Sequence, residues 1–192
     1  MTSGAAAILR RGGVGILPTD TLYGIVGQAF SREAVRRIYL LRRRNPKKPM
    51  IILIGDIGDL RLFGIRLTPQ TKAAVRVLWP GKVSVLLDFP LRNKRLLRTF
   101  SYLHRGTKSL AFRLPAPQAL RSLLRKTGPL VAPSANFEGE PPALTPAVAR
   151  AYFGDRVDFY LDRGRRAGKP STLVRLEKGR VVVLREGAVR FG

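Results

Sequence analysis

The residues of this sequence that could carry chemistry are hydroxyl-bearing and basic side chains that follow apolar runs. Five segments share one layout, in which an apolar stretch of strand length leads into small polar or basic residues. Hydroxyls and amides hold neutral oxygens, and an arginine fork binds phosphate or carboxylate through two bonds at once. A ligand with phosphates and polar groups would suit this combination. The five segments are 16–21, 42–49, 109–115, 130–136 and the tail from residue 171.

Each of these segments also has a purely structural interpretation. Thr19 can satisfy backbone groups in a turn, and Ser134 and Asn136 are common turn residues. The basic run 42–48 can be a solvated helix face or a general nucleic-acid patch. Arg113 is harder to explain in this way. It alternates with apolar neighbours in an expected interior strand, where an unpaired charge is costly.

Missing residue types argue against several catalytic classes. The chain has no cysteine and one histidine, His104, which we expect at the surface. It has no G-x-S-x-G elbow and no clustered carboxylates, which disfavours a Ser-His-Asp hydrolase, a zinc enzyme and a two-carboxylate glycosidase. The absence of G-x-x-x-x-G-K-[ST] excludes a P-loop NTPase. Chemistry would have to come from positioning and electrostatics, as in nucleotidyl transfer with a metal carried in by the phosphates.

The composition is strongly basic, with 36 Lys plus Arg against 12 Asp plus Glu and a formal net charge of +24. This charge predicts anionic partners, which are nucleic acid, nucleotide phosphates or both. The basic residues are scattered along the chain, so an arginine-rich surface without a specific role explains many of them equally well. No apolar run approaches the roughly 20 residues that span a membrane. With no cysteine framework either, we expect a cytoplasmic protein without membrane contact.

Apolar periodicity predicts alternating strands and helices in a single domain, 1–192, with 45% hydrophobic residues to build its core. The resulting class is α/β with a mixed sheet, in which loops at strand ends bring distant segments together. Helices are expected over 4–11, 31–44, 68–79, 116–128 and 145–154, with a short one within 56–65. Strands are expected over 14–17, 49–54, 82–89, 109–115, 129–136, 157–162 and twice within 171–187, with a hairpin turn at Lys178-Gly179.

A family resemblance emerges from the motifs taken in order. PTDTLYGI, R-x-R…KKPM, WPGKVS, LAFRLP, APSANFEGEPP and STLV…LREG resemble the YrdC-type threonylcarbamoyl-AMP synthase family from about residue 4 to residue 188. The resemblance implies a twisted open sheet with flanking helices and a large, basic, concave cavity. It also implies that L-threonine, bicarbonate and ATP give threonylcarbamoyl-adenylate and pyrophosphate, with Mg²⁺ carried by the ATP phosphates. A partner transferase then moves the threonylcarbamoyl group onto the adenosine next to the anticodon of certain tRNAs.

The resemblance further implies roles for single residues. Thr19 stands at the family's threonine contact, Arg113 is expected to hold the threonine carboxylate or a phosphate, and Thr172 lies in the substrate strand. Arg42 and Arg44 fall where the family carries K-x-R, and they are the expected catalytic contacts to the nucleotide phosphates. The rest of the nucleotide site is expected at Ser134, Asn136 and Arg185.

Some positions depart from the family pattern or have two interpretations. Arg42 takes the place of the usual lysine, and the two are not interchangeable. Asn45 replaces the proline that commonly follows the motif. Asp20, the only acid within a motif, suits turn formation as well as metal binding. Gly24 and Gly27 are expected to let the chain turn closely around the ligand.

Two other functions remain alternatives to the synthase. One is a basic RNA-binding module of the same fold without catalysis, and direct binding of tRNA is compatible with the synthase as well. The other is a paralogue that keeps the nucleotide cavity but acts on another carbamoyl or acyl substrate. Retention of PTDT, R-x-R, S-x-N and the distal arginine together favours the synthase, because RNA binding alone needs no S-x-N pocket.

Overall fold

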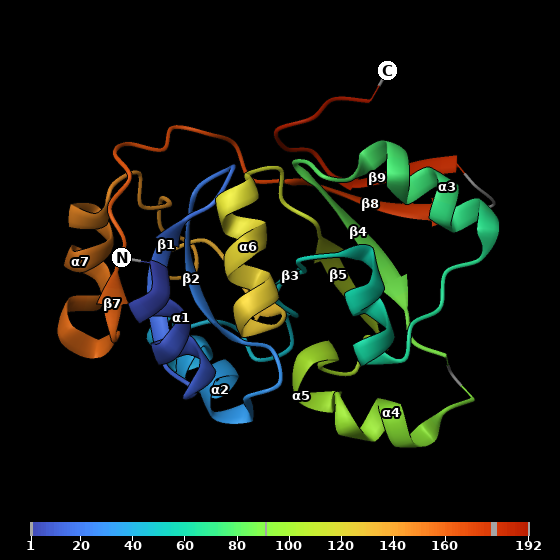
Figure 1. The fold of residues 1–192 in the computed structure, drawn as a ribbon, viewed down its shortest axis with the longest axis horizontal. Helices are drawn as coiled ribbons and strands as arrows, with labels where there is room; N and C mark the ends of the chain where they lie inside the picture. The colour runs from blue at the N-terminus through green and yellow to red at the C-terminus, as the bar shows by residue number, and fades with distance from the viewer. Residues whose placement is uncertain (1, 91, 178–179, 192) are drawn as a thin grey trace.

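The structure is a computed structural model that describes residues 2–90, 92–177 and 180–191. Its centre is one mixed sheet with the spatial order β7-β1-β2-β6-β3-β5-β4-β8-β9 (Figure 1). The strands are β1 (Val14–Pro18), β2 (Tyr23–Gln28), β3 (Ile52–Leu53), β4 (Val83–Asp88), β5 (Ser109–Arg113), β6 (Leu130–Val131), β7 (Phe159–Tyr160), β8 (Thr172–Glu177) and β9 (Arg180–Arg185). The helices are α1 (Thr2–Arg10), α2 (Arg32–Leu41), α3 (Pro69–Leu78), α4 (Lys94–Thr99), α5 (Ser101–His104), α6 (Gln118–Thr127) and α7 (Pro146–Phe153), with 3₁₀ turns η1 (Ile57–Phe63) and η2 (Gly154–Arg156).

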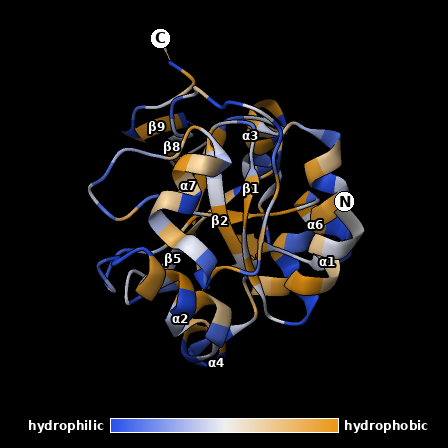
Figure 2. Ribbon diagram, turned by 90° about the vertical axis from the view of Figure 1, so that its left-hand side faces the viewer, coloured by the Kyte–Doolittle hydropathy of each residue, from blue (hydrophilic) through white to orange (hydrophobic). Residues whose placement is uncertain are grey.

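Antiparallel and parallel strand pairs alternate irregularly across the sheet. The parallel pairs are β1 with β7, β3 with β5, and β4 with β8, and the other neighbours run antiparallel. Helices cover both faces, and Figure 2 shows α1 and α6 on one side of β1 and β2, with α2 and α7 on the other. The expected α/β class with a mixed sheet and flanking helices is therefore confirmed.

Side chains alternate between the two faces because successive strand residues point in opposite directions. In β1, Leu17 packs with the buried residues of α1 and α6. Ile16 belongs to the larger apolar cluster on the other face, together with Ile38 of α2. The start of α2 follows its sequence signal, since the hydroxyl of Ser31 accepts a hydrogen bond from the N–H of Ala34. None of the described helices has the length and apolar character needed to cross a membrane.

Several elements differ from the sequence-based expectations. The segment after PTDT forms the strand β2, although its glycines favoured a turn, and α4 and α5 were not predicted. The helix expected over 31–44 ends at Leu41, with Arg42 as its C-cap. The hairpin turn expected at Lys178-Gly179 lies outside the described residues.

The expectation that His104 lies at the surface is wrong. His104 is buried, with its Nε2 2.8 Å from the carbonyl oxygen of Leu97 and its Nδ1 accepting a hydrogen bond from Gly106. The ring also packs edge-on against Phe89. These contacts make His104, the last residue of α5, part of the folded core rather than a solvated side chain.

The two glycines of β2 have different surroundings. Gly24 pairs across the sheet with Ser134, and Gly27 lies under α2. A Cβ atom at Gly27 would lie 3.0 Å from the Cβ of Ala34 and 3.2 Å from the Cδ1 of Ile38. The missing side chain at Gly27 therefore lets helix α2 approach the sheet closely, whereas Gly24 lines the cavity described below.

We predict that Gly27→Ala lowers the free energy of unfolding by about 1–3 kcal/mol, because the added methyl group overpacks the contact with α2. Gly4→Ala is the matched control. Gly4 lies in α1 with no atom within 4 Å of an added Cβ, so the same substitution should be neutral or slightly stabilising. Urea unfolding followed by circular dichroism measures both. Equal stability of the two variants would contradict close packing at Gly27.

Candidate functional site

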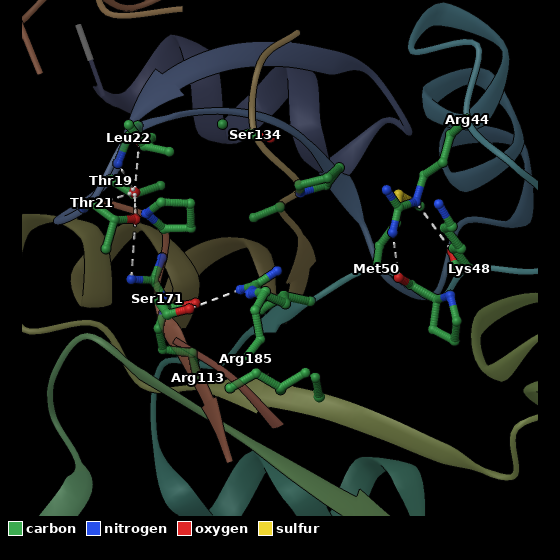
Figure 3. A pocket seen from close by; sticks show the side chains of 18 of the residues that line it. Thr19, Thr21, Leu22, Arg44, Lys48, Met50, Arg113, Ser134, Ser171 and Arg185 are labelled. Atoms are coloured by element: carbon green, nitrogen blue, oxygen red, sulfur yellow. Dashed lines mark hydrogen bonds between the residues drawn. The ribbon is translucent and has the colours of Figure 1, made fainter. Parts of the chain in front are cut away.

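A cavity of about 480 Å³ lies between β2, β5, β8 and the loop after α2, within the size range of small-molecule sites. Its walls combine hydroxyls with apolar side chains such as Leu86, Met50 and Leu173. Among the described residues, no Asp or Glu lines it. Six basic residues do, and they are Arg42, Arg44, Lys47, Lys48, Arg113 and Arg185. Figure 3 shows Arg44 and Lys48 at one end and Thr19, Thr21 and Arg113 at the other.

Strand β5 supplies one wall through residues that alternate along it. Ser109, Ala111 and Arg113 line the cavity, whereas the intervening Leu110 and Phe112 are fully buried in the core. The sequence analysis identified only Arg113 on this strand. Ser109 and Ala111 could have been predicted from Arg113, because every second residue of a strand faces the same side and these two precede Arg113 by four and two positions.

The same alternation corrects the prediction for Thr172. Its neighbours Ser171 and Leu173 line the cavity, whereas Thr172 is fully buried and does not line it. The Thr172 hydroxyl donates to the carbonyl of Val189 at 2.6 Å and accepts from the N–H of Val189 at 3.0 Å. Thr172 therefore ties the C-terminal segment to β8. The prediction was one residue out of register, and a shift of one residue reverses the face of a strand.

Thr19 lines the cavity, but its hydroxyl is occupied by the turn that connects β1 to β2. It donates to the carbonyl of Leu22 at 2.7 Å and accepts from the backbone N–H groups of Thr21 and Leu22, both at 3.2 Å. The hydroxyl of Thr21 lies 3.0 Å from that of Thr19 and 3.4 Å from Nη1 of Arg113. Thr19 thus shapes the turn, and Thr21 is the hydroxyl with capacity left for a ligand.

Arg113 forms a buried ion pair with Asp20, at 2.7 Å between Nη1 and Oδ1. The two side chains are only 4% and 5% exposed, and Asp20 also accepts from the N–H of Ala116 at 3.2 Å. Burial lowers the pKa of Arg113, and the charge of Asp20 opposes that shift. Asp20 is therefore a counter-ion that joins the β1–β2 turn to the end of β5. In the described chain, no group of three or more acidic or histidine side chains is placed to hold a metal ion.

Arg42 points from the end of α2 toward the loop that follows β6. Its Nε donates to the carbonyl of Asn136 at 3.0 Å, and its Nη2 lies 3.4 Å from the hydroxyl of Ser134. Its Nη1 is buried and has no hydrogen-bond partner among the described residues. Burial, followed by the charge of Arg44, lowers the pKa of Arg42 to about 10. The fork that replaces the family lysine is thus bound to the loop that carries Ser134, and its remaining donor is enclosed by protein.

Ser134 and Asn136 differ in their position relative to the cavity. Ser134 is half-buried and lines the cavity, as expected. Asn136 does not line it, and its amide donates to the carbonyls of Phe137 and Glu140 at 2.6 and 2.7 Å. The expected nucleotide contact of Asn136 is therefore not supported by its position. Its amide folds the loop that carries Ser134, because a buried amide is most favourable when fully hydrogen-bonded.

Arg44 and Arg185 are held by backbone carbonyls. Arg44 donates to the carbonyls of Lys48 and Pro49 at 3.1 and 2.8 Å, and Arg185 donates to that of Ser171 at 2.8 Å. Burial and then the charge of Arg44 lower the pKa of Arg185, so the two guanidiniums repel each other. Neither is within ion-pair distance of a described carboxylate. They form a preorganised site for an anion.

Gly187, at the end of the LREG motif, allows the C-terminal segment to lie against β8. A Cβ atom there would be 2.4 Å from the carbonyl oxygen of Pro170 and 2.6 Å from the nitrogen of Thr172. This close approach of two backbones is possible only for glycine. This contact places Arg185 next to Ser171, so both motif residues line the same part of the cavity.

The structure thus brings six of the eight expected site residues to one cavity. Those six are Thr19, Arg42, Arg44, Arg113, Ser134 and Arg185, whereas Asn136 and Thr172 lie behind its walls. The contacts that these side chains make with ligands stay predictions.

Comparisons with known proteins identify the fold and family of this arrangement. The family model Sua5_yciO_yrdC, described as "Telomere recombination", matches residues 7–187. The chain is 33% identical over 180 residues to the threonylcarbamoyl-AMP synthase of Thiobacillus denitrificans, with 93% of each chain covered.

Solved structures show the same fold. P. abyssi Sua5 complexed with L-threonine superposes with a TM-score of 0.84 at 27% identity, over 97% of this chain and 54% of that one. E. coli YciO superposes with a TM-score of 0.80 at 23% identity, over 97% and 88% of the two chains. This chain therefore spans about half the length of the P. abyssi protein and most of E. coli YciO.

We predict that Asp20→Asn lowers the free energy of unfolding by roughly 3 kcal/mol, because it leaves the buried Arg113 without its counter-charge. Asp88→Asn is the control. Asp88 lies 3.6 Å from Arg175, and the two side chains are 61% and 37% exposed. Loss of this solvated pair should change stability by no more than about 0.5 kcal/mol. A small effect of Asp20→Asn in urea unfolding would show that cavity water already solvates Arg113.

Proposed function

We propose, from the premise that this chain belongs to the Sua5–YciO–YrdC family, that it is a threonylcarbamoyl-AMP synthase. Its substrates are L-threonine, bicarbonate and ATP, and its products are threonylcarbamoyl-adenylate and pyrophosphate. The adenylate supplies the threonylcarbamoyl group that a partner transferase attaches to tRNA. The enzyme acts in the cytoplasm, where these substrates occur together.

The observation that carries this proposal is a cavity lined by six basic residues and, among the described residues, by no Asp or Glu. Arg44 and Arg185 line this cavity and have no described carboxylate within ion-pair distance. Phosphate oxygens would supply the missing negative charge, because each phosphate presents several acceptors to an arginine fork.

The two ends of the cavity suit different parts of the substrates. At one end, the charge of Arg113 is offset by Asp20, and its Nη1 lies 3.4 Å from the hydroxyl of Thr21. This end suits the carboxylate of threonine beside the hydroxyl of Thr21. At the other end, Arg44, Lys47 and Lys48 have a larger surplus of positive charge, which suits the triphosphate with its Mg²⁺.

The chemistry of the proposal requires little covalent participation by the protein. The threonine amine and bicarbonate give a carbamate with loss of water. An oxygen of that carbamate attacks the α-phosphorus of ATP while the bond to pyrophosphate breaks. Negative charge develops on the α-phosphate oxygens and on the leaving group. Guanidiniums already fixed by carbonyl contacts stabilise that charge without reorganising during the reaction.

The test is pyrophosphate release from ATP by the purified chain. We expect release that requires both L-threonine and bicarbonate, and loss of the signal when either is omitted. Release with a different amine would instead support a paralogue with another carbamoyl substrate. No release with any amino acid, together with RNA affinity that falls steeply with salt, would support the RNA-binding alternative.

We predict that Arg185→Ala lowers kcat/KM for ATP at least roughly tenfold, the loss expected for one charge-assisted hydrogen bond. Arg180→Ala is the matched control, because Arg180 lies on the same strand β9, is exposed and does not line the cavity. It should leave kcat/KM unchanged while removing the same charge. An equal loss in both variants would indicate a general effect of net charge rather than a contact.

A further inference from the structure

Two loops that are distant in sequence meet beside the cavity through Glu138. We define the cationic loop as residues 42–49 and the S-x-N loop as residues 134–140. The N–H of Glu138 donates to the carbonyl of Arg42 at 2.8 Å. Its carboxylate accepts from the backbone N–H of Asn45 and from Nζ of Lys48, the latter at 2.8 Å. Beside it, the guanidinium of Arg43 lies 4.3 Å from the ring centre of Phe137.

We propose that Glu138 is a positioning residue that latches the cationic loop against the S-x-N loop and thereby sets the affinity of the cavity for a polyphosphate. The identification of that polyphosphate as ATP rests on the proposed function. Glu138 itself does not line the cavity. It acts through the residues of the cationic loop that do, which are Arg42, Arg44, Lys47 and Lys48.

The cationic loop needs an external restraint because its own charges repel. Five of the seven residues from 42 to 48 are Lys or Arg, and helix α2 has already ended at Leu41. The backbone of Arg43 has a φ of 50°, a conformation that non-glycine residues seldom adopt. Within the described chain, Glu138 is the carboxylate that pairs with this loop. The hydrogen bond from Lys48, followed by that from Asn45, lowers the pKa of Glu138, so the carboxylate is charged at neutral pH.

The latch also explains the departure of Asn45 from the family pattern. A proline at this position would have no N–H to donate, whereas Asn45 donates its N–H to Glu138. The side chain of Asn45 additionally accepts from the N–H of Lys47 at 2.9 Å. In this chain, hydrogen bonds to a charged residue of a second loop therefore replace the stiffness that a proline ring would give.

The primary test compares Glu138→Ala and Glu138→Gln with Glu140→Ala, a control on an exposed acid of the same loop. We expect Glu138→Ala to raise KM for ATP about fivefold with kcat within about twofold, the effect of a partly exposed charged contact on binding alone. Glu138→Gln keeps an acceptor for Asn45, so it should restore part of the affinity. Glu140→Ala should match the parent protein. A KM for Glu138→Ala equal to that of the parent would overturn the proposal.

A second measurement does not depend on catalysis. Amide hydrogen exchange across 42–48 should become about tenfold faster in Glu138→Ala and stay unchanged in Glu140→Ala, because exchange reports local opening. The affinity for tripolyphosphate should fall in parallel. Unchanged exchange would overturn the latch. Faster exchange in a protein that never releases pyrophosphate would leave the latch standing and remove the proposed function.

A double-mutant cycle isolates the contact between the loops. Asn45→Pro removes the N–H donor, so its effect on tripolyphosphate affinity should be much smaller in the Glu138→Ala background than in the parent. Independent effects that simply multiply would show that Asn45 and Glu138 do not act through one another, and would contradict the latch.

Discussion

Six basic side chains must be held around one small cavity against their mutual repulsion, and the local architecture of the site follows from this constraint. Burial lowers the pKa of both Arg42 and Arg185, and the charge of Arg44 lowers each of them further. The chain does not neutralise these charges with carboxylates in the cavity wall. It holds most of them by backbone carbonyls, by one buried ion pair and by one carboxylate outside the wall. An incoming anion therefore meets donors that are already in place and only partly compensated.

The fold provides this arrangement through contacts between distant segments of one sheet. The β1–β2 turn reaches Arg113 although β6 and β3 lie between β2 and β5 in the sheet order. The C-terminal segment returns along β8, where Gly187 permits backbone contact and Thr172 binds Val189. Motif residues with similar side chains consequently have different structural roles. Thr21, Ser134 and Ser171 face the cavity, whereas Thr19, Asn136 and Thr172 use their polar atoms to build its walls.

The division between residues that face the cavity and residues that build its walls explains how a family motif can change while the cavity is kept. Replacing the family lysine by Arg42 adds a planar fork that contacts both Asn136 and Ser134 of the S-x-N loop. Replacing the proline by Asn45 adds an N–H group, and Glu138 accepts it. Each change is accommodated within the contact between the cationic loop and the S-x-N loop. Each departure thus contacts the S-x-N loop, which is more than 90 residues away in sequence.

The sequence by itself determined the α/β class, the existence of the longer helices α1, α2, α3, α6 and α7, and the strand ends that carry polar residues, because these depend on periodicity and on local capping. It also indicated that Arg113 is buried, since a charge that alternates with apolar residues must lie in a strand. Only the tertiary structure decided that Asp20 is its partner, that His104 is buried, and that Ser171 rather than Thr172 faces the cavity. Those outcomes depend on register and on contacts between segments such as Asp20 and Arg113, 93 residues apart. A local pattern cannot specify them, because a strand shifted by one residue has the same composition and the opposite face.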